Sequence, residues 1–280
     1  MILIADSGST KTDWRIIDGE NQIHQFQTTG IHPFFVTDKQ VLEAMQAAFL
    51  TEFPAATIRQ VYFYGSGLSS KEEITRFKNL FQALFQLAKI EIHHDLLGAA
   101  RALCGTEPGF ALILGTGANT CTYSDGQIIT NISSTGFIMG DEGSGADLGK
   151  RWVHAYITEL APEHLRTAFY KAYGANKELI LERVYKGERP NRFLASFCPF
   201  LKTHIEDPFI LNLVTQAFEE LIQNYLLRYE RKPEWKVNAT GSIAYSFSNV
   251  LSNCLEKHGL SLGNLVQKPI AALALYHLPE

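Results

Sequence analysis

Residues 2–12 read ILIADSGSTKT, a short apolar run that meets Asp6 and then passes into a turn rich in glycine, serine and threonine. Residues 12–18 alternate between polar and apolar side chains and end at Asp18-Gly19, a dipeptide typical of a hairpin turn. A third run covers residues 23–28. The opening of the chain therefore predicts three strands joined by two tight turns.

The same plan returns further along the chain. Residues 110–114, FALIL, form an apolar run that ends at Gly115-Thr116-Gly117-Ala118-Asn119. An alternating run follows over residues 120–124, ends at Asp125-Gly126 and leads into a third run over residues 127–132. Because the same order of strands and turns occurs twice, we interpret the chain as an internal duplication.

The rest of the sequence places helices between strands. Short apolar runs predict strands at 61–64, 90–94 and 237–239. Apolar periodicity predicts helices over 37–53, 70–89, 96–103, 242–257 and 270–278, and mostly helix from 145 to 229, where Asp207-Pro208 starts the longest one. Strands mixed with crossover helices, twice over, predict an α/β protein of two related lobes.

The stretch 105–109 is the predicted boundary between the lobes. We expect an N-terminal lobe of residues 1–106, onto which a terminal helix at 269–280 returns, and a C-terminal lobe of residues 107–268 with a helical insertion.

Composition excludes several classes of protein. The 280 residues are 46% hydrophobic and 19% charged, with a net charge of −4. An acidic balance argues against nucleic acid as the main ligand. The absence of a long apolar run or of a signal-peptide pattern predicts a cytoplasmic protein without a membrane span. The four cysteines form no CxxC pair, so we expect reduced core residues.

Two turns have the composition of phosphate sites. Glycine allows close approach of an oxyanion, and hydroxyl and backbone N–H groups can bind it. Asp6, at the end of the first strand, is a candidate ligand for hydrated Mg²⁺. Each turn alone is also compatible with a plain hairpin. The candidate phosphate-binding residues are Gly8, Ser9, Thr10, Lys11, Gly115, Thr116, Gly117 and Asn119.

Three further segments carry polar chemistry. Asp95 stands at the carboxyl end of a strand and opens a helix, where it can accept a proton or cap the helix. The loop 140–147, GDEGSGAD, sets two carboxylates among glycines, which suits polar hydroxyls or a plain cap. Thr240-Gly241-Ser242 is a strand-to-helix turn that lets a flat group lie on the backbone.

Taken in order, these segments resemble the actin-like ATPase superfamily of sugar kinases and Hsp70-type proteins. Within it they are most similar to the N-acetylglucosamine kinase branch, which is grouped with the BadF/BadG/BcrA/BcrD ATPases. The segment Met139–Ser144, MGDEGS, carries the most specific part of the resemblance. The resemblance implies two actin-like (ribonuclease H-like) lobes with a nucleotide cleft between them.

The resemblance also implies roles for the site residues. Asp95 lies at the position of the family's catalytic base, and Asp6 is the candidate magnesium ligand. Thr240, Gly241 and Ser242 resemble the family's adenosine motif. The implied sugar-binding residues are His32, Ser66, Gly67, Asp95, Asp141 and Ser144. His32 departs from the family, whose amino-sugar kinases commonly have asparagine there, and Phe137-Ile138 replaces a tryptophan-containing stretch. Both departures touch the sugar pocket.

The implied function is an ATP-dependent kinase acting on the 6-hydroxyl of an amino sugar, with ATP and Mg²⁺ as cofactors. N-acetylglucosamine is the first choice of substrate, and N-acetylmuramic acid and glucosamine are alternatives. An ATPase activator of a partner enzyme, holding an iron–sulfur cluster through cysteines, and a non-enzymatic sugar sensor are the other classes. The partners expected are the sugar and ATP, and the oligomeric state is open, a homodimer included.

Overall fold

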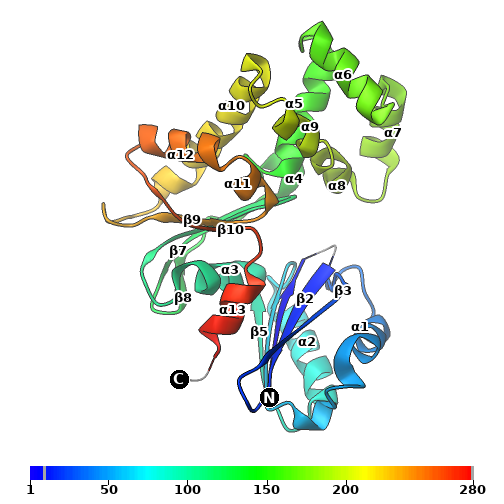
Figure 1. Ribbon diagram of the computed structural model, residues 1–280, viewed down its shortest axis with the longest axis vertical. Coiled ribbons are helices and arrows are strands. Elements are labelled where there is room, and N and C mark those ends of the chain that lie inside the picture. The colour runs from blue at the N-terminus through cyan, green and yellow to red at the C-terminus, as the bar shows by residue number, and fades with distance from the viewer. Residues whose placement is uncertain (9–10, 279–280) are drawn as a thin grey trace. The chain divides into compact units, whose positions relative to one another are not determined.

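The computed structural model describes residues 1–8 and 11–278 of the chain. The chain divides into two units (Figure 1). The first comprises Met1–Glu107, Asp125–Ile128 and Lys268–Glu280, and the second comprises Pro108–Ser124 and Ile129–Gln267. The short segment 125–128 groups with the first unit because Asp125 donates its N–H to the Thr106 carbonyl (3.3 Å) and Arg101 Nε donates to the Gly126 carbonyl (3.3 Å).

The first unit is built on a five-stranded mixed sheet in the order β3-β2-β1-β4-β5. Its strands are β1 (Ile2–Ser7), β2 (Lys11–Ile17), β3 (Ile23–Thr29), β4 (Gln60–Gly65) and β5 (Lys89–His94). The first three strands are antiparallel neighbours, whereas β4 and β5 run parallel to β1. In register, Ser7 lies beside Gly65, and Gly65 lies beside His94. The carboxyl ends of β1, β4 and β5 therefore meet at one edge.

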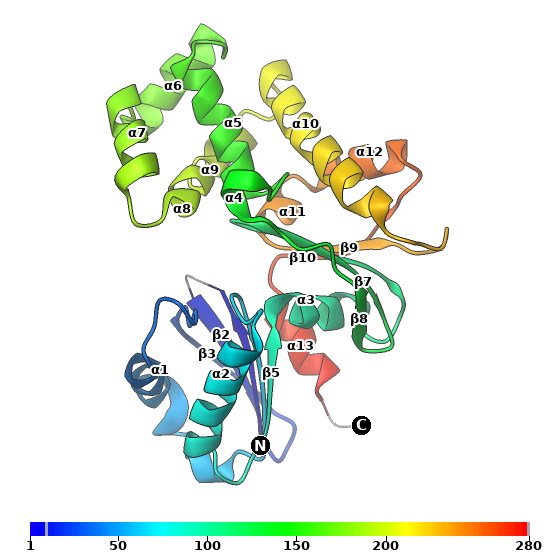
Figure 2. The ribbon, with the colours of Figure 1, turned by 180° about the vertical axis from the view of Figure 1, so that it is seen from behind.

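Helices cover both faces of this sheet (Figure 2). On one face α1 (Asp38–Met45), its π-helical continuation (Gln46–Leu50) and α2 (Lys71–Leu84) bury aromatic side chains around Trp14 and Phe63. A 3-10 turn at Ala55–Thr57 precedes β4. On the other face α3 (Asp95–Cys104) and α13 (Ile270–Tyr276) cover the sheet, and Tyr64 belongs to the core beneath them.

The second unit repeats the sheet. Its order is β10-β9-β6-β7-β8, formed by β6 (Gly109–Leu114), β7 (Ala118–Ser124), β8 (Gln127–Thr130), β9 (Val237–Thr240) and β10 (Leu262–Val266). β6 and β7 are antiparallel, and β9 and β10 run parallel to β6. Third, second, first, fourth and fifth strands thus lie side by side in both units, which supports the predicted duplication.

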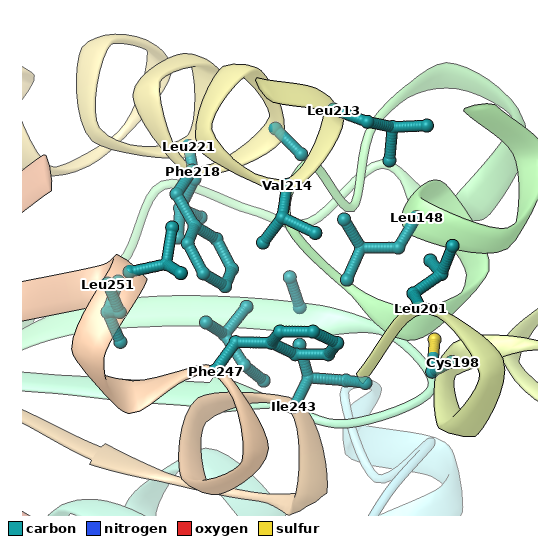
Figure 3. Close-up of a cluster of buried hydrophobic side chains, with 14 of the residues drawn as sticks. Leu148, Cys198, Leu201, Leu213, Val214, Phe218, Leu221, Ile243, Phe247 and Leu251 are labelled. Atoms are coloured by element: carbon teal, nitrogen blue, oxygen red, sulfur yellow. The ribbon is translucent and has the colours of Figure 1, made fainter. Parts of the chain in front are cut away.

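The helical part of the second unit is larger. It comprises α4 (Gly136–Met139), α5 (Gly145–Ile157), α6 (Glu163–Tyr173), α7 (Lys177–Lys186), α8 (Pro190–Ala195), α9 (Cys198–Thr203), α10 (Pro208–Asn224), a 3-10 turn (Leu226–Arg228), α11 (Ser242–Ser246) and α12 (Ser248–Lys257). Phe218 of α10 and Phe247 beside α12 lie in its core, with Leu148 of α5 (Figure 3). Asp207 caps α10 by accepting the Phe209 N–H, as the Asp-Pro start predicts. No helix in the described part of the chain is long and apolar enough to cross a membrane.

The structure confirms the α/β fold class and corrects some element boundaries. The helix predicted over 70–89 ends at Leu84, because Phe85 leaves helical geometry and Lys89 already begins β5. The helix predicted over 242–257 is broken at Phe247 into α11 and α12. β10 was not predicted, since its sequence LGNLV contains glycine and asparagine, which strands disfavour.

Candidate functional site

In the first unit, buried hydroxyl groups hold the two ends of the predicted phosphate turn. Gly8 donates its N–H to the Lys11 carbonyl (3.0 Å), which closes the turn between β1 and β2. The Ser7 hydroxyl lies 2.7 Å from that of Thr12 and 2.9 Å from the Ile31 carbonyl. The predicted roles of Ser9 and Thr10 fall on residues outside those that the structure describes.

A group of acidic side chains lies beside this turn. Asp6 and Asp13 are opposite each other in the β1–β2 pair. Burial, helped by the negative charges of Asp95 and Asp13, raises the pKa of Asp6 to about 7, against the opposing effect of Lys11. The carboxyl group is therefore held where its charge is poorly compensated by the protein. A bound cation would supply that compensation.

Magnesium fits this donor set. Among residues 1–8 and 11–278, no three histidine, cysteine or acidic side chains come together as a metal-binding group. Mg²⁺ does not need such a group, because it keeps several waters and is commonly held by one or two carboxylates plus substrate phosphates. Asp6, with its raised pKa, suits that mode of binding.

Asp95 occupies the start of α3, directly after β5, but it does not cap the helix. The cap is His94, whose Nδ1 accepts the Leu96 N–H (3.1 Å). The capping alternative for Asp95 is therefore wrong. Asp95 Oδ1 is buried and lies 2.7 Å from His94 Nδ1, so the two residues form a histidine–carboxylate pair. Burial tends to lower the pKa of His94, but the Asp95 carboxylate outweighs it and the pKa is raised.

Three of the four residues predicted for the sugar in this unit, His32, Ser66 and Gly67, lie close together. Ser66 donates its N–H to the Ser7 carbonyl (2.9 Å), while its buried hydroxyl oxygen has no partner. Gly67 has a φ of +81°, and a Cβ there would come within 2.6 Å of His32 Cε1. The backbone of Gly67 therefore supports the His32 ring directly. The His32 Nδ1 accepts the Phe34 N–H (3.3 Å), which fixes the ring orientation.

In the second unit, the predicted glycine turn is tied to the start of α5. Gly115 donates its N–H to the Gly117 carbonyl (3.0 Å). The Gly115 and Thr116 carbonyls accept the N–H groups of Gly145 (2.8 Å) and Ala146 (3.0 Å). Asn119 Oδ1 accepts from the Asn131 side chain (3.0 Å). The turn and the MGDEGS segment, distant in sequence, therefore form one structure.

Asp141 lies against this turn. Its φ is +59°, and a Cβ on Gly117 would approach its Oδ2 to 2.9 Å. Ser134 donates a hydrogen bond to its Oδ1 (2.5 Å). Burial raises the pKa of Asp141, although the hydrogen bonds from Ser134 and the Ala118 backbone act in the opposite direction. A buried carboxyl group held in place by these hydrogen bonds can accept further ones from hydroxyl groups.

Ser144 is the N-cap residue of α5. It is fully buried, and its hydroxyl accepts the Asp147 N–H (3.2 Å) as the cap of α5. That geometry stabilises the helix start, and the contact of Ser144 with a sugar stays a prediction.

The Thr240-Gly241-Ser242 turn joins the same cluster. Gly241 has a φ of +111°, and a Cβ there would lie 2.2 Å from the Leu114 carbonyl oxygen. Only glycine allows this approach. The Thr240 hydroxyl is buried and has no partner. The structure thus brings three predicted motifs of the second unit together.

The sequence analysis did not identify Ser134 as a hydrogen-bond partner of Asp141, or Asp13 as a neighbour of Asp6. Ser134 follows the third strand of the second unit, as His32 follows the third strand of the first. The duplication itself was therefore the signal that could have found it. Asp13 faces the same side of the sheet as Asp6, and Gln27 donates to its Oδ1 (2.8 Å).

Two similar sheets, each with a glycine-containing turn after its first strand, define the actin-like ATPase fold. The chain belongs to the BadF/BadG/BcrA/BcrD ATPase family, whose model matches residues 5–272. None of the curated proteins matches the chain.

Solved structures agree with this assignment. A candidate N-acetylglucosamine kinase of Porphyromonas gingivalis is 40% identical, with a TM-score of 0.92 over 99% of this chain and 98% of that one. A candidate N-acetylglucosamine kinase of Chromobacterium violaceum is 20% identical, with a TM-score of 0.79 over 98% of each chain. Component A of (R)-2-hydroxyglutaryl-CoA dehydratase from Acidaminococcus fermentans is 14% identical, with a TM-score of 0.52 over 99% of this chain and 95% of that one. The last two show likeness of fold alone.

Proposed function

We propose that this protein is an ATP-dependent kinase that phosphorylates the 6-hydroxyl of an amino sugar, with N-acetylglucosamine as the first substrate to test. The observation that carries the proposal is the Asp95 carboxylate, paired with His94 at the sheet edge that also holds Asp6 and the glycine turn. A carboxylate at the carboxyl end of a strand, held by a neighbouring histidine, is placed to accept a proton from a bound hydroxyl group. The 40% identical candidate N-acetylglucosamine kinase supports the choice of sugar.

Asp95 acts as the general base in this proposal. It accepts the proton of the sugar 6-hydroxyl while that oxygen forms a bond to the γ-phosphorus of ATP. The bond between this phosphorus and the β,γ-bridging oxygen breaks, and ADP leaves. Phosphoryl transfer depends mainly on positioning and on stabilisation of the phosphate charges.

Each unit has its own part in binding. In the first unit, Asp6 would hold Mg²⁺, which neutralises phosphate charge when bound. The Gly8–Lys11 turn binds phosphate, and His32, Ser66 and Gly67 bind sugar. In the second unit, the Gly115–Asn119 turn binds phosphate, Thr240–Ser242 accommodates adenosine, and Asp141 accepts hydrogen bonds from sugar hydroxyls.

The cysteines do not favour the activator alternative. All four are buried. Burial raises the pKa of Cys198 to about 12. The pKa of Cys254 is raised to about 11, and burial is the largest of the causes. Cluster ligands must be thiolates. Neither cysteine is suited to that role in this conformation.

A coupled ADP-release assay tests the proposed function. MgATP is presented with N-acetylglucosamine, N-acetylmuramic acid, glucosamine and glucose in parallel. We expect turnover that depends on an amino sugar and is largest with N-acetylglucosamine. ATP hydrolysis that ignores every sugar would contradict the kinase and support an ATPase activator.

A further inference from the structure

We propose that Lys268 is a second phosphate-binding cation of this protein, acting with Lys11 and held beside it by Asp13. The inference rests on the proposed use of ATP and adds a residue that no sequence motif indicated. Lys268 begins the last segment of the first unit, immediately before α13. Although far apart in sequence, Lys268 and Lys11 approach the same carboxylate.

The geometry places one buried acid between two exposed amines. Lys11 Nζ lies 3.7 Å from Asp13 Oδ2, and Lys268 Nζ lies 4.0 Å from Asp13 Oδ1. The Asp13 side chain is 11% exposed, whereas those of Lys11 and Lys268 are 44% and 50% exposed. The carboxylate is therefore fixed in the protein, and the ammonium groups remain accessible to a ligand.

Neither lysine is seated tightly on Asp13. Both separations exceed the roughly 2.7–2.9 Å of a direct charged hydrogen bond. Asp13 Oδ1 already accepts a hydrogen bond from Gln27 Nε2 at 2.8 Å, which holds the carboxylate in place. A loose ion pair of this kind contributes little to the free energy of unfolding. A gain in stability therefore does not explain why two lysines lie beside the same carboxylate.

The two amines also disfavour each other. The contact with Lys268 is the largest cause that lowers the pKa of Lys11, followed by burial. Two cations that share the Asp13 carboxylate at 3.7 Å and 4.0 Å gain further compensation once an oxyanion binds. Lys11 is the first residue of β2, at the end of the turn that begins with Gly8. A polyphosphate on that turn is the anion with the matching charge and position.

The test measures phosphate affinity apart from catalysis. Calorimetry gives the affinity of the full-length protein for magnesium tripolyphosphate, MgATP and AMP, and sugar-dependent turnover is measured separately. We expect Lys268→Met to weaken tripolyphosphate and MgATP binding by about 10–100-fold, since a hydrogen bond to a charged group contributes roughly 1.5–3 kcal/mol. Lys268→Arg should retain most of the affinity, and the KM for the sugar should change little.

Lys39→Met is the matched control. Lys39 belongs to the same unit and lies 3.7 Å from one carboxylate, that of Glu43, so its loss tests a simple surface ion pair. The inference is overturned if Lys268→Met binds MgATP as tightly as wild type, or if it weakens AMP binding equally. It is also overturned if wild type binds neither polyphosphate. A lysine effect on MgATP binding without sugar-dependent turnover would support the inference while the proposed kinase fails.

Discussion

The first-strand turns of the two units follow the same topology but differ in chemistry. In the first unit, Asp6 and Asp13 face each other across the antiparallel pair, whereas the corresponding pair in the second unit is Ile113 and Asn119. The first turn therefore carries charge. The second is neutral and is fastened by backbone hydrogen bonds to Gly145 and Ala146. A duplicated sheet thus carries an acidic edge in one copy and a turn fastened by backbone hydrogen bonds in the other.

Replacement of Asp95 should have the largest effect, because it removes the proposed general base. We expect Asp95→Asn to lower kcat by about 10²–10⁴-fold with little change in melting temperature. Steady-state kinetics and thermal unfolding measure the two quantities. Glu72→Gln is the control, since Glu72 also lies in the first turn of a helix of this unit but is exposed. An unchanged kcat in Asp95→Asn would remove the general base from the mechanism.

Gly241→Ala tests the rigid cradle of the second unit. The added Cβ would meet the Leu114 carbonyl, and φ would remain at +111°. We expect a loss of unfolding free energy of about 1–3 kcal/mol or more, measured by urea denaturation. Gly8→Ala is the matched variant in the first turn, where the nearest atom to a Cβ is 3.7 Å away. Equal stability losses in both variants would show that the two turns do not differ as described.

Asp6→Asn tests the charged edge through pH. The folded-state pKa of Asp6 is raised to about 7, so ionisation opposes folding. This penalty is absent below the unfolded pKa near 4, grows as pH rises to about 7 and is constant above it. At pH 8, Asp6→Asn should therefore have a melting temperature a few degrees above that of wild type, at roughly 2–4 °C per kcal/mol. At pH 4, the two proteins should have the same melting temperature.

The same variant separates the magnesium role from simple repulsion. Mg²⁺ with ADP should stabilise wild type more than Asp6→Asn, because the amide is a poor ligand for this cation. Differential scanning fluorimetry at pH 8 measures both effects. If both proteins gain the same stability from MgADP, Asp6 does not hold the ion.

Ser134→Ala should have the smallest effect. It removes the hydrogen bond to Asp141 and thereby one influence that lowers the pKa of that carboxyl group. We expect the KM for the sugar to rise by about 3–10-fold, since one hydrogen bond contributes roughly 0.5–1.5 kcal/mol. Ser133→Ala, at the exposed neighbouring position, serves as control. A KM equal to wild type would show that Asp141 needs no support from the loop after β8.

The sequence predicted the parts of the fold that depend on local patterning. Alternating and apolar runs bounded by glycine turns predicted β1 to β3 and β6 to β8, and the internal duplication followed from them. The fifth strand of the second unit, β10, was missed because its glycine and asparagine give no strand signal. It forms a strand through its pairing with β9, which is a tertiary effect.

By itself, the sequence determined the fold class, the family and the segments where chemistry is concentrated, because turns, caps and motifs are local. Only the tertiary structure decided what those segments do to one another. In the folded chain, His94 is the N-cap of α3 and the buried Ser144 is the N-cap of α5. Gly241 packs closely against the Leu114 carbonyl. The tertiary structure also brought Lys268 to Asp13, far away along the chain. Such contacts depend on how strands and helices meet in space, which residue spacing does not encode.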